Sequence, residues 1–421
     1  MNPSTFSRRT LLGLGAATAA ATMLPGCSAK SGPMRVAWYG PDPVTKAINK
    51  ALDAWKSNGG ADFAPESAPF DDYWDKLATQ TSGNNAPDVL RMSMSYFSDY
   101  AGRGALKDLG SLGIDTSGLD PDVAGSGTAD GKNFGIGQSS ISYAMYLDEA
   151  AVKKAGGSVP KQGWTWDAFA EFAKDYSGSV QGTFGSSDQA SNFQLFEVFA
   201  RQHGTELFAE DGSKLTTSKD TIQEWFQYWA DLRAAKAAPP QNVSGETTAI
   251  EKSLVATGKA PLQFGWVQQV TFYQPLVKSP LTVLPVPQDK AGDLKGQFIK
   301  ALDLWCVSAA SKHPEDAAKL IGFLLNDETA IKTIGILLGV PPSKKARDVV
   351  SADADSAGAR AIAYVEDIAG KVGPSPRPWP KGYGEMLTGF GRIAENIGFG
   401  KATPASGASE FVELAGKTLG Q

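Results

Sequence analysis

Aromatic side chains stand at the predicted ends of two strands, where a folded chain could present them to a ligand. Trp38 and Tyr39 close the first predicted strand, and Trp266 follows a glycine at the end of a later one. Flat aromatic rings pack against the apolar faces of sugars and other polyols, while amide, hydroxyl, carboxylate and guanidinium groups bond to their hydroxyls. The chain therefore holds the side chain types that a polyol-binding site needs.

A search for catalytic combinations finds none. The chain has two histidines, His203 and His313, which leaves little material for a Ser-His-Asp triad or a His-rich metal site. It lacks a complete Gly-x-x-x-x-Gly-Lys-Ser/Thr phosphate loop, and no local pattern among its 45 acidic residues singles out the carboxylate pair of a glycosidase. We therefore expect a binding protein without catalytic residues, metal or cofactor. A surface-anchored hydrolase of polysaccharide or lipid is the alternative from another class.

Length and charge narrow the possibilities further. A chain of 421 residues is too long for one ordinary core, so two lobes of roughly 150–200 residues are expected. The formal net charge is −5, and residues 27–421 contain 38 basic and 45 acidic residues. Because nucleic-acid binding requires clustered Lys and Arg, we expect no nucleic-acid partner.

The first 32 residues have the pattern of an export signal. Arg8 and Arg9 precede an apolar segment, residues 11–24, which is shorter than the roughly 20 residues of a spanning helix. The arginine pair favours twin-arginine export, and Leu-Pro-Gly-Cys ending at Cys27 is similar to a bacterial lipobox. We expect a signal peptide over residues 1–26, a lipid on Cys27 and a linker over 27–32, which would hold the protein at the outer face of the cytoplasmic membrane. Plain secretion is the alternative.

Apolar periodicity predicts alternating strands and helices along the rest of the chain, which is typical of α/β layers with a largely parallel sheet. Strands are expected over residues 34–39, 87–92, 260–266, 281–287 and 302–308. Helices are expected over residues 44–55, 70–77, 97–104, 166–176, 221–237 and 313–325. Thr165 and either Asp71 or Asp72 are suited to cap the helices that they precede or begin.

Several residues that could attract attention are expected only to pack. Trp55, Trp74, Trp225 and Trp229 lie on apolar faces of predicted helices. Cys306 stands in an apolar strand without a partner if Cys27 is acylated, so we expect a buried, inert thiol.

Taken in order, segments of the chain resemble the family 1 extracellular solute-binding proteins, the maltose-binding-protein-like group. Gly-Lys-Asn-Phe-Gly-Ile at residues 131–136, Trp-Thr-Trp-Asp at 164–167 and Ser-Lys-His-Pro-Glu-Asp-Ala-Ala-Lys at 311–319 are similar to elements of that family. Further similar segments are residues 36–40, 72–77, 86–89, 103–109, 210–215, 225–229, 237–240 and 377–383. Their order and spacing carry the resemblance.

The resemblance implies a two-lobed, periplasmic-binding-protein-like α/β fold of type II, with a ligand cleft between lobes that hinge strands join. Crossings are expected near residues 140, 304 and 341. The N-terminal lobe would comprise residues 33–140 and 305–340, and the C-terminal lobe residues 141–304 and 341–421. Ligand binding would then close the lobes for recognition by an ABC transporter permease.

The resemblance also implies a set of ligand contacts. They are Trp38, Tyr39, Ser95, Tyr96, Gln138, Ser139, Ser140, Trp266, Asp303, Arg377 and Trp379. Asp303 occupies a position where sugar-binding relatives often carry an aromatic residue, and two interpretations stay open: a ligand contact or a salt bridge at the hinge. The ligand is expected to be a carbohydrate, bound by a monomer. The alternative within the same fold is another polar metabolite, a glycerophosphodiester or a cationic solute.

Overall fold

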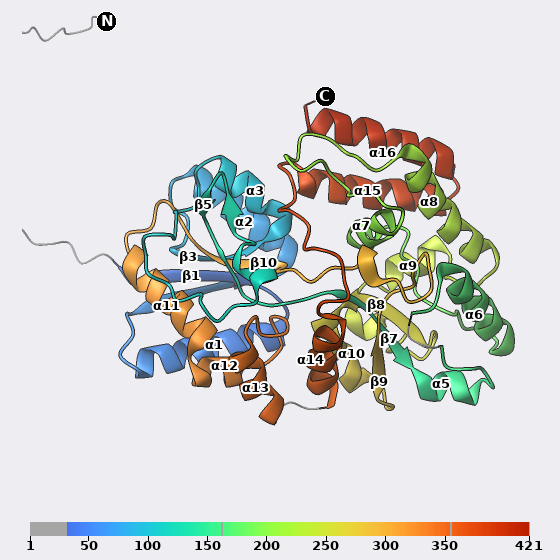
Figure 1. The fold of residues 1–421 in the computed structure, drawn as a ribbon, viewed down its shortest axis with the longest axis horizontal. Coiled ribbons are helices and arrows are strands. Elements are labelled where there is room, and N and C mark those ends of the chain that lie inside the picture. Colours follow the sequence, from blue (N-terminus) through green and yellow to red (C-terminus); the bar gives the residue numbers. More distant parts are fainter. Residues whose placement is uncertain (1–31, 161–162, 354–355, 421) are drawn as a thin grey trace, which may run out of the picture. The chain divides into compact units, whose positions relative to one another are not determined.

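The first strands along the chain belong to a five-stranded sheet (Figure 1). The structure is a computed structural model that describes residues 32–160, 163–353 and 356–420, so Arg8, Arg9 and Cys27 lie outside the described residues. The strand order is β2 (Phe63–Ala68), β1 (Met34–Tyr39), β3 (Val89–Ser93), β10 (Asp303–Val307) and β6 (Ile136–Gly137). β1 pairs in parallel with β2 and β3, whereas β10 runs antiparallel to β3 and β6.

Alternate side chains of this sheet enter two apolar clusters on its opposite faces. Val36 and Trp38 pack in the cluster that includes the buried faces of three helices, whose bounds are α1 (Asp42–Ser57), α11 (Pro314–Asn326) and α12 (Glu328–Ile334). Ala37 and Met92 pack in the other cluster, with α2 (Phe70–Ser82) and α3 (Met94–Gly102). This lobe is therefore a sheet covered by helices on both faces.

The second sheet has three strands in the order β8 (Leu262–Trp266), β7 (Tyr143–Asp148) and β9 (Leu281–Leu284). Both of its pairings are antiparallel. The expectation of a largely parallel sheet is therefore wrong for this lobe and holds only for β1, β2 and β3. The local alternation of strand and helix does not reveal the direction in which strands pair, because that direction depends on how the chain connects strands that are distant in sequence.

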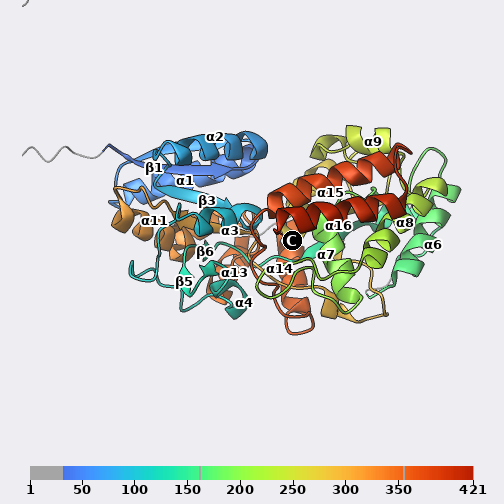
Figure 2. The same cartoon turned by 90° about the horizontal axis from the view of Figure 1, so that it is seen from above.

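Helices surround the smaller sheet. They are α5 (Glu149–Lys154), α6 (Trp166–Ser179), α7 (Phe193–Gln202), α8 (Lys219–Ala234), α9 (Gln241–Glu246), α10 (Val270–Tyr273), α14 (Ser356–Ile368), α15 (Tyr383–Gly398) and α16 (Pro404–Thr418). Figure 2 shows α15 and α16 side by side, and α16 also packs along α8. The predicted packing roles of Trp225 and Trp229 are confirmed, since neither side chain is exposed.

Short elements complete the described chain: α4 (Pro121–Ala124), the hairpin of β4 (Thr128–Ala129) and β5 (Lys132–Asn133), and α13 (Lys344–Asp353). Single 3₁₀ turns lie at Ile250–Lys252, Val267–Gln269, Gln274–Leu276 and Leu294–Gly296. Within the ranges that the structure describes, none of the helices has both the length and the apolar character of a membrane span.

Two predicted helix starts have different outcomes. Thr165 caps α6 as predicted, because its hydroxyl accepts a hydrogen bond from the Ala168 N–H at 3.2 Å. The cap predicted at Asp71 or Asp72 is wrong: Pro69 precedes α2, and both carboxylates lie in its first turn. There they can act only through the positive end of the helix dipole.

The chain crosses between the two sheets at neighbouring segments. Ser140 forms an antiparallel bridge to Val340, and Ile141 forms another to Lys300. These bridges lie close to the expected crossings near residues 140, 304 and 341. The predicted boundary places residues 303 and 304 in the C-terminal lobe. Because β10 begins at Asp303, Asp303 and Leu304 belong instead to the larger sheet.

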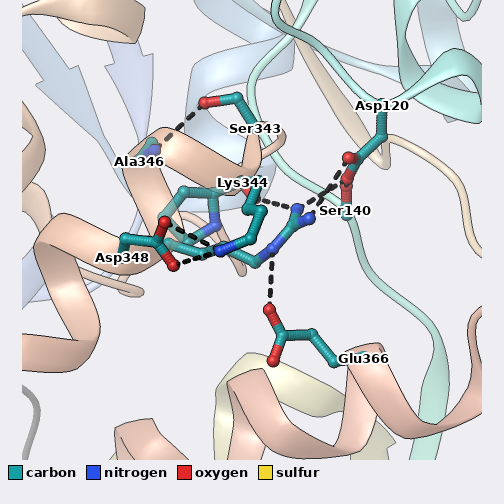
Figure 3. Close-up of polar contacts among 9 residues, drawn as sticks. Asp120, Ser140, Ser343, Lys344, Ala346, Asp348 and Glu366 are labelled. Carbon is teal, nitrogen blue, oxygen red and sulfur yellow. Dashed lines mark hydrogen bonds and ion pairs between the residues drawn. The ribbon is translucent and has the colours of Figure 1, made fainter.

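Arg347 on α13 ties several of these segments together through its bonds to Asp120 and Glu366, which Figure 3 labels. Arg347 donates two hydrogen bonds to the Asp120 carboxylate, one to the Pro341 carbonyl at 3.1 Å and one to Glu366 on α14 at 3.3 Å. Ser140 donates to the same Asp120 carboxylate at 2.7 Å. One guanidinium group thus connects the loop before α4, two crossing segments and α14.

Candidate functional site: a cleft between the two lobes

A cleft of about 760 Å³ lies where the larger sheet faces the smaller one. The carboxyl ends of β1, β2 and β3 reach it, and so does the start of the antiparallel β10. Open α/β sheets bind ligands at this edge. The other lobe contributes Gln194 from α7, Trp266 from the end of β8, Gln269 and Leu387 from α15. The volume is within the usual range of roughly 300–1,000 Å³ for small-molecule sites.

Four aromatic residues line this cleft: Tyr39 and Phe70 from one lobe, and Trp266 and Phe272 from the other. Trp266 packs against Tyr143 with 4.5 Å between ring centroids, and its indole N–H donates to Gln194 at 3.2 Å. Phe70, in the first turn of α2, is 40% exposed and packs edge-on against Tyr39 at 5.0 Å. The Phe70 and Trp266 rings are each held by neighbours, so each offers a fixed apolar surface to a ligand.

The floor of the cleft is a buried polar network. Arg91 Nη2 donates to Asp303 Oδ2 at 2.8 Å, and Arg91 Nη1 donates to the Tyr39 carbonyl at 2.6 Å. The Tyr39 hydroxyl donates to Asp303 Oδ1. Burial raises the pKa of the Tyr39 phenol, with the Asp303 charge adding to it, so this group stays a donor. Burial alone would lower the pKa of Arg91, but the Asp303 carboxylate, together with Tyr39 and Tyr73, outweighs burial, and the net direction is upward.

A second cavity of about 510 Å³ adjoins the cleft and shares Gln194, Trp266, Gln269 and Leu387 with it. Its other polar lining residues are rich in amides and hydroxyls: Ser187, Gln189, Ser191, Asn192, Gln241, Ser244, Thr247, Thr248 and Gln263. Asp188, which also lines it, is paired with Arg233 at 2.5 Å. The combined surface is a polar groove that passes Trp266.

The structure brings four of the predicted ligand contacts together in the cleft: Tyr39, Ser95, Trp266 and Asp303. Gln138 supports them from behind, since its amide oxygen, in the orientation that satisfies both groups, accepts from Arg91 Nε at 3.1 Å and Nη2 at 3.2 Å.

Four other predicted contacts lie elsewhere. Trp38 is fully buried against α1 and does not line the cleft; its indole N–H donates to Thr45 at 3.3 Å. Tyr96 stacks on Trp74 at 4.1 Å and faces a different surface hollow. Ser139 is fully buried at the crossing segment, where Ser140 is bonded to Asp120. Trp38 points into the core because alternation along β1 places it on the α1 side.

Arg377 and Trp379 also lie outside the cleft. They line a separate cavity of about 560 Å³ formed by residues 205–216 and 374–379. Arg377 is an exposed partner of Glu210, whereas Trp379 is 1% exposed and stacks on Tyr383 with 4.1 Å between centroids. The predicted placement of these two side chains in the ligand cleft is therefore wrong for this structure: the loop carrying them turns toward Glu210 and Glu197.

Trp379 also separates two buried charges. Its indole N–H donates to Glu197 at 3.0 Å, and the Lys300 ammonium lies 3.6 Å from its ring centroid. Burial raises the pKa of Glu197 and lowers that of Lys300 to about 8. Glu197, Lys300 and Trp379 therefore support the packing at the segment where Lys300 bridges to Ile141. None of the three lines the cleft.

Sequence reasoning missed most residues of the cleft, and Phe70 and Arg91 are two instructive cases. Phe70 is interpreted from the sequence as the start of a helix. Its position directly after Pro69, at a strand–helix junction, resembles that of Trp38 and Tyr39. Arg91 is interpreted only as one residue of a short strand. Its partner, Asp303, lies 212 residues away on β10 and is revealed only by the pairing of the two strands. Over the ranges that the structure describes, no three His, Cys, Asp or Glu side chains are grouped as metal ligands.

Comparison with known proteins defines the class. Residues 50–362 match the family model of bacterial extracellular solute-binding proteins, which is well over half of the chain. The chain therefore belongs to the bacterial extracellular solute-binding proteins, and the resemblance seen in its sequence is confirmed. Its two-lobed α/β fold agrees: it superposes with a TM-score of 0.69 on the family 1 extracellular solute-binding protein from Alicyclobacillus acidocaldarius, at 29% identity over 93% of this chain and 100% of that one.

Two further relatives are similar over shorter stretches. The chain is 24% identical over 287 residues to the arabinooligosaccharide-binding protein of Bacillus subtilis, covering 65% of this chain and 64% of that protein, so it spans just under two thirds of that relative's length. It is 26% identical over 341 residues to an uncharacterized lipoprotein of Streptomyces antibioticus, covering 74% of this chain and 71% of the relative.

Proposed function

We propose that this solute-binding protein captures a carbohydrate in the cleft between its lobes and delivers it to the permease of an ABC importer. The observation that carries the proposal is the pair of aromatic surfaces, Phe70 and Trp266, on a cleft whose polar groups are mainly hydroxyls and amides beside a neutralised ion pair. Sugars need aromatic surfaces for their C–H faces and polar groups for their hydroxyls. The similarity to an arabinooligosaccharide-binding protein supports the same ligand class.

The adjoining cavity supports a ligand longer than one sugar unit. It continues the cleft past Trp266, and most of its polar lining is uncharged. Amides and hydroxyls both donate and accept hydrogen bonds, as sugar hydroxyls do. An oligosaccharide can therefore lie across Trp266 with units in both cavities.

The competing ligands have less support. A cationic solute would need a free, unscreened carboxylate in the cleft, but Asp303 already accepts from Arg91 and Tyr39, and Asp42 is exposed to solvent and salt. A glycerophosphodiester would need a free guanidinium or ammonium, and Arg91 is the cation among the described lining residues, already bonded to Asp303. Binding without turnover is the expected behaviour of the family, and turnover of a glycoside or ester would favour a hydrolase.

Thermal unfolding with and without candidate ligands tests the proposal. A ligand at 100 times its dissociation constant adds about 2.7 kcal/mol to the free energy of unfolding. We expect neutral oligosaccharides to raise the melting temperature, and Trp266→Ala and Phe70→Ala to abolish or weaken that rise. Phe399→Ala is the matched control, because Phe399 is 54% exposed and does not line the cleft. A rise only with polyamines or glycerophosphodiesters would refute the carbohydrate ligand.

We further propose that the protein is exported by the twin-arginine route and anchored by a lipid on Cys27, as a monomer at the outer face of the cytoplasmic membrane. The Arg8-Arg9 pair, the apolar segment and the lipobox-like Cys27 support this, as does the similarity to a lipoprotein. Metabolic labelling with a radioactive fatty acid should mark the wild-type chain and leave Cys27→Ser unlabelled. Label on the Cys27→Ser chain, or an unlabelled wild type, would contradict the anchor.

A further inference from the structure

We infer that the buried Arg91–Asp303 pair makes the cleft select uncharged carbohydrates over acidic and amino sugars. This inference rests on the proposed function and adds a specificity-determining pair to it. Of the two open interpretations of Asp303, the structure shows the salt bridge, formed with Arg91. The inference adds that this pair shapes what the cleft admits.

The pair is built into the sheet. Asp303 on β10 lies opposite Ser93 on β3, and Arg91 is two residues from Ser93, so the two side chains are diagonal neighbours on one face. Their side chains are 8% and 6% exposed, and both belong to the lining of the cleft. The charges are thus placed where a ligand must meet them and where water screens them little.

Each charge is paired within the protein. The Arg91 guanidinium bonds to Asp303, to the Tyr39 carbonyl and to Gln138, and it lies 4.5 Å from the Tyr39 ring centroid. The two Asp303 oxygens accept from Tyr39 and from Arg91. Because the two charges balance each other, neither is left as an unpaired counter-ion for a ligand carboxylate or ammonium.

A charged ligand group at the floor of the cleft would therefore lose water without gaining a counter-ion, which disfavours it strongly. Asp42 is the other charged residue of the described lining of this cleft, and it is exposed, so solvent and salt weaken its attraction for an ammonium group. A sugar hydroxyl loses less on entering, because the hydroxyls and amides around the floor can satisfy it. The pair thus disfavours charged ligand groups because its own two charges balance each other.

Sugars matched in length and differing in charge test the inference on the wild-type protein. The probes are trimers of glucose and of galactose in three forms each, neutral, uronate and amino sugar, together with arabinotriose, measured by isothermal titration calorimetry. We expect binding of at least one neutral trimer and binding at least about tenfold weaker for its charged counterparts. A uronate or amino-sugar trimer that binds as tightly as its neutral counterpart overturns the inference but leaves the carbohydrate ligand standing. Failure of every trimer would instead count against the proposed function itself, and the inference would fall with it.

Two variants then test the role of the pair. Asp303→Asn leaves the Arg91 charge unmatched, and we expect the affinity ratio of uronate to neutral trimer to rise at least about tenfold. Asp42→Asn is the matched control, and it should change that ratio much less. If Asp303→Asn does not fold, Arg91→Gln leaves the Asp303 charge unmatched instead, and the affinity ratio of amino-sugar to neutral trimer should then rise at least about tenfold. An unchanged ratio in whichever of the two variants folds overturns the inference.

Discussion

Arg347 and Asp120 form a two-pronged ion pair at the crossing segments, with Nη1 to Oδ2 at 2.7 Å and Nη2 to Oδ1 at 3.3 Å. The Arg347 side chain is 12% exposed and that of Asp120 is 30% exposed. The same guanidinium group reaches the Pro341 carbonyl and Glu366. A planar guanidinium holds such a set of acceptors in one geometry, which a lysine could not do. This pair therefore fixes how the loop before α4 meets the crossing segments.

Replacing Arg347 by Met should lower the free energy of unfolding by about 2 kcal/mol, because Asp120 keeps its partly buried charge and loses its main partner. Urea denaturation measures the change. Lys344→Gln is the control from the same helix: Lys344 pairs with Asp348 at 2.8 Å, but both side chains are more than half exposed. Such a pair contributes about 0.5 kcal/mol or less. Equal losses in the two variants would contradict the assigned role of Arg347.

Glu66 gives the protein a predicted acid sensitivity. Burial would raise its pKa, but hydrogen bonds from Arg35, Lys76 and Gln80 outweigh burial and lower it from 4.5 to about 2. A carboxylate with a lowered folded pKa stabilises the protein above its unfolded pKa, and this contribution is lost as the pH falls toward the folded value. Glu66→Gln should therefore be less stable than the wild type at pH 7, with the gap closing between pH 4.5 and pH 2.

Urea titrations of both proteins at several pH values between 7 and 2.5 provide the measurement. Glu413→Gln is the control, because Glu413 is an exposed residue of α16. A gap between the wild type and Glu66→Gln that stays constant over the whole pH range would show that Glu66 acts only by packing.

The Cys306 thiol should be inert in the folded protein. It is fully buried in β10, and burial raises its pKa. Since the thiolate is the reactive form, a thiol reagent should modify Cys306 in a Cys27→Ser protein only as fast as the chain unfolds. Labelling followed by absorbance across a urea series checks this, and rapid labelling in the absence of urea would refute the buried position.

The sequence predicts local structure in this protein better than it predicts contacts between residues that are far apart in the chain. β1, α6 and the placement of Trp266 follow from periodicity and from the Gly-Trp pair at a strand end, because neighbouring residues decide them. The contact between Arg91 and Asp303 escaped such reasoning because it depends on the register of two strands far apart in the chain. Arg377 and Trp379 were misplaced for a related reason: the path of the proline-rich loop at residues 374–380 depends on Glu197 and Glu210 across the fold.

The first turns of α6 and α2 allow a capping hydrogen bond to be compared with a first-turn charge by its effect on the free energy of unfolding. The Thr165 hydroxyl satisfies a backbone N–H that α6 would otherwise leave without a partner, so Thr165→Ala should cost about 1 kcal/mol of stability. Thr165→Ser keeps the hydroxyl and should cost much less. Asp72→Ala removes only a first-turn charge, worth about 0.5 kcal/mol at low salt, and that loss should disappear in concentrated salt. Urea titrations at low and high ionic strength separate the two effects. If the Thr165→Ala loss also vanished with salt, or if Thr165→Ser cost as much as Thr165→Ala, the capping role of Thr165 would be wrong.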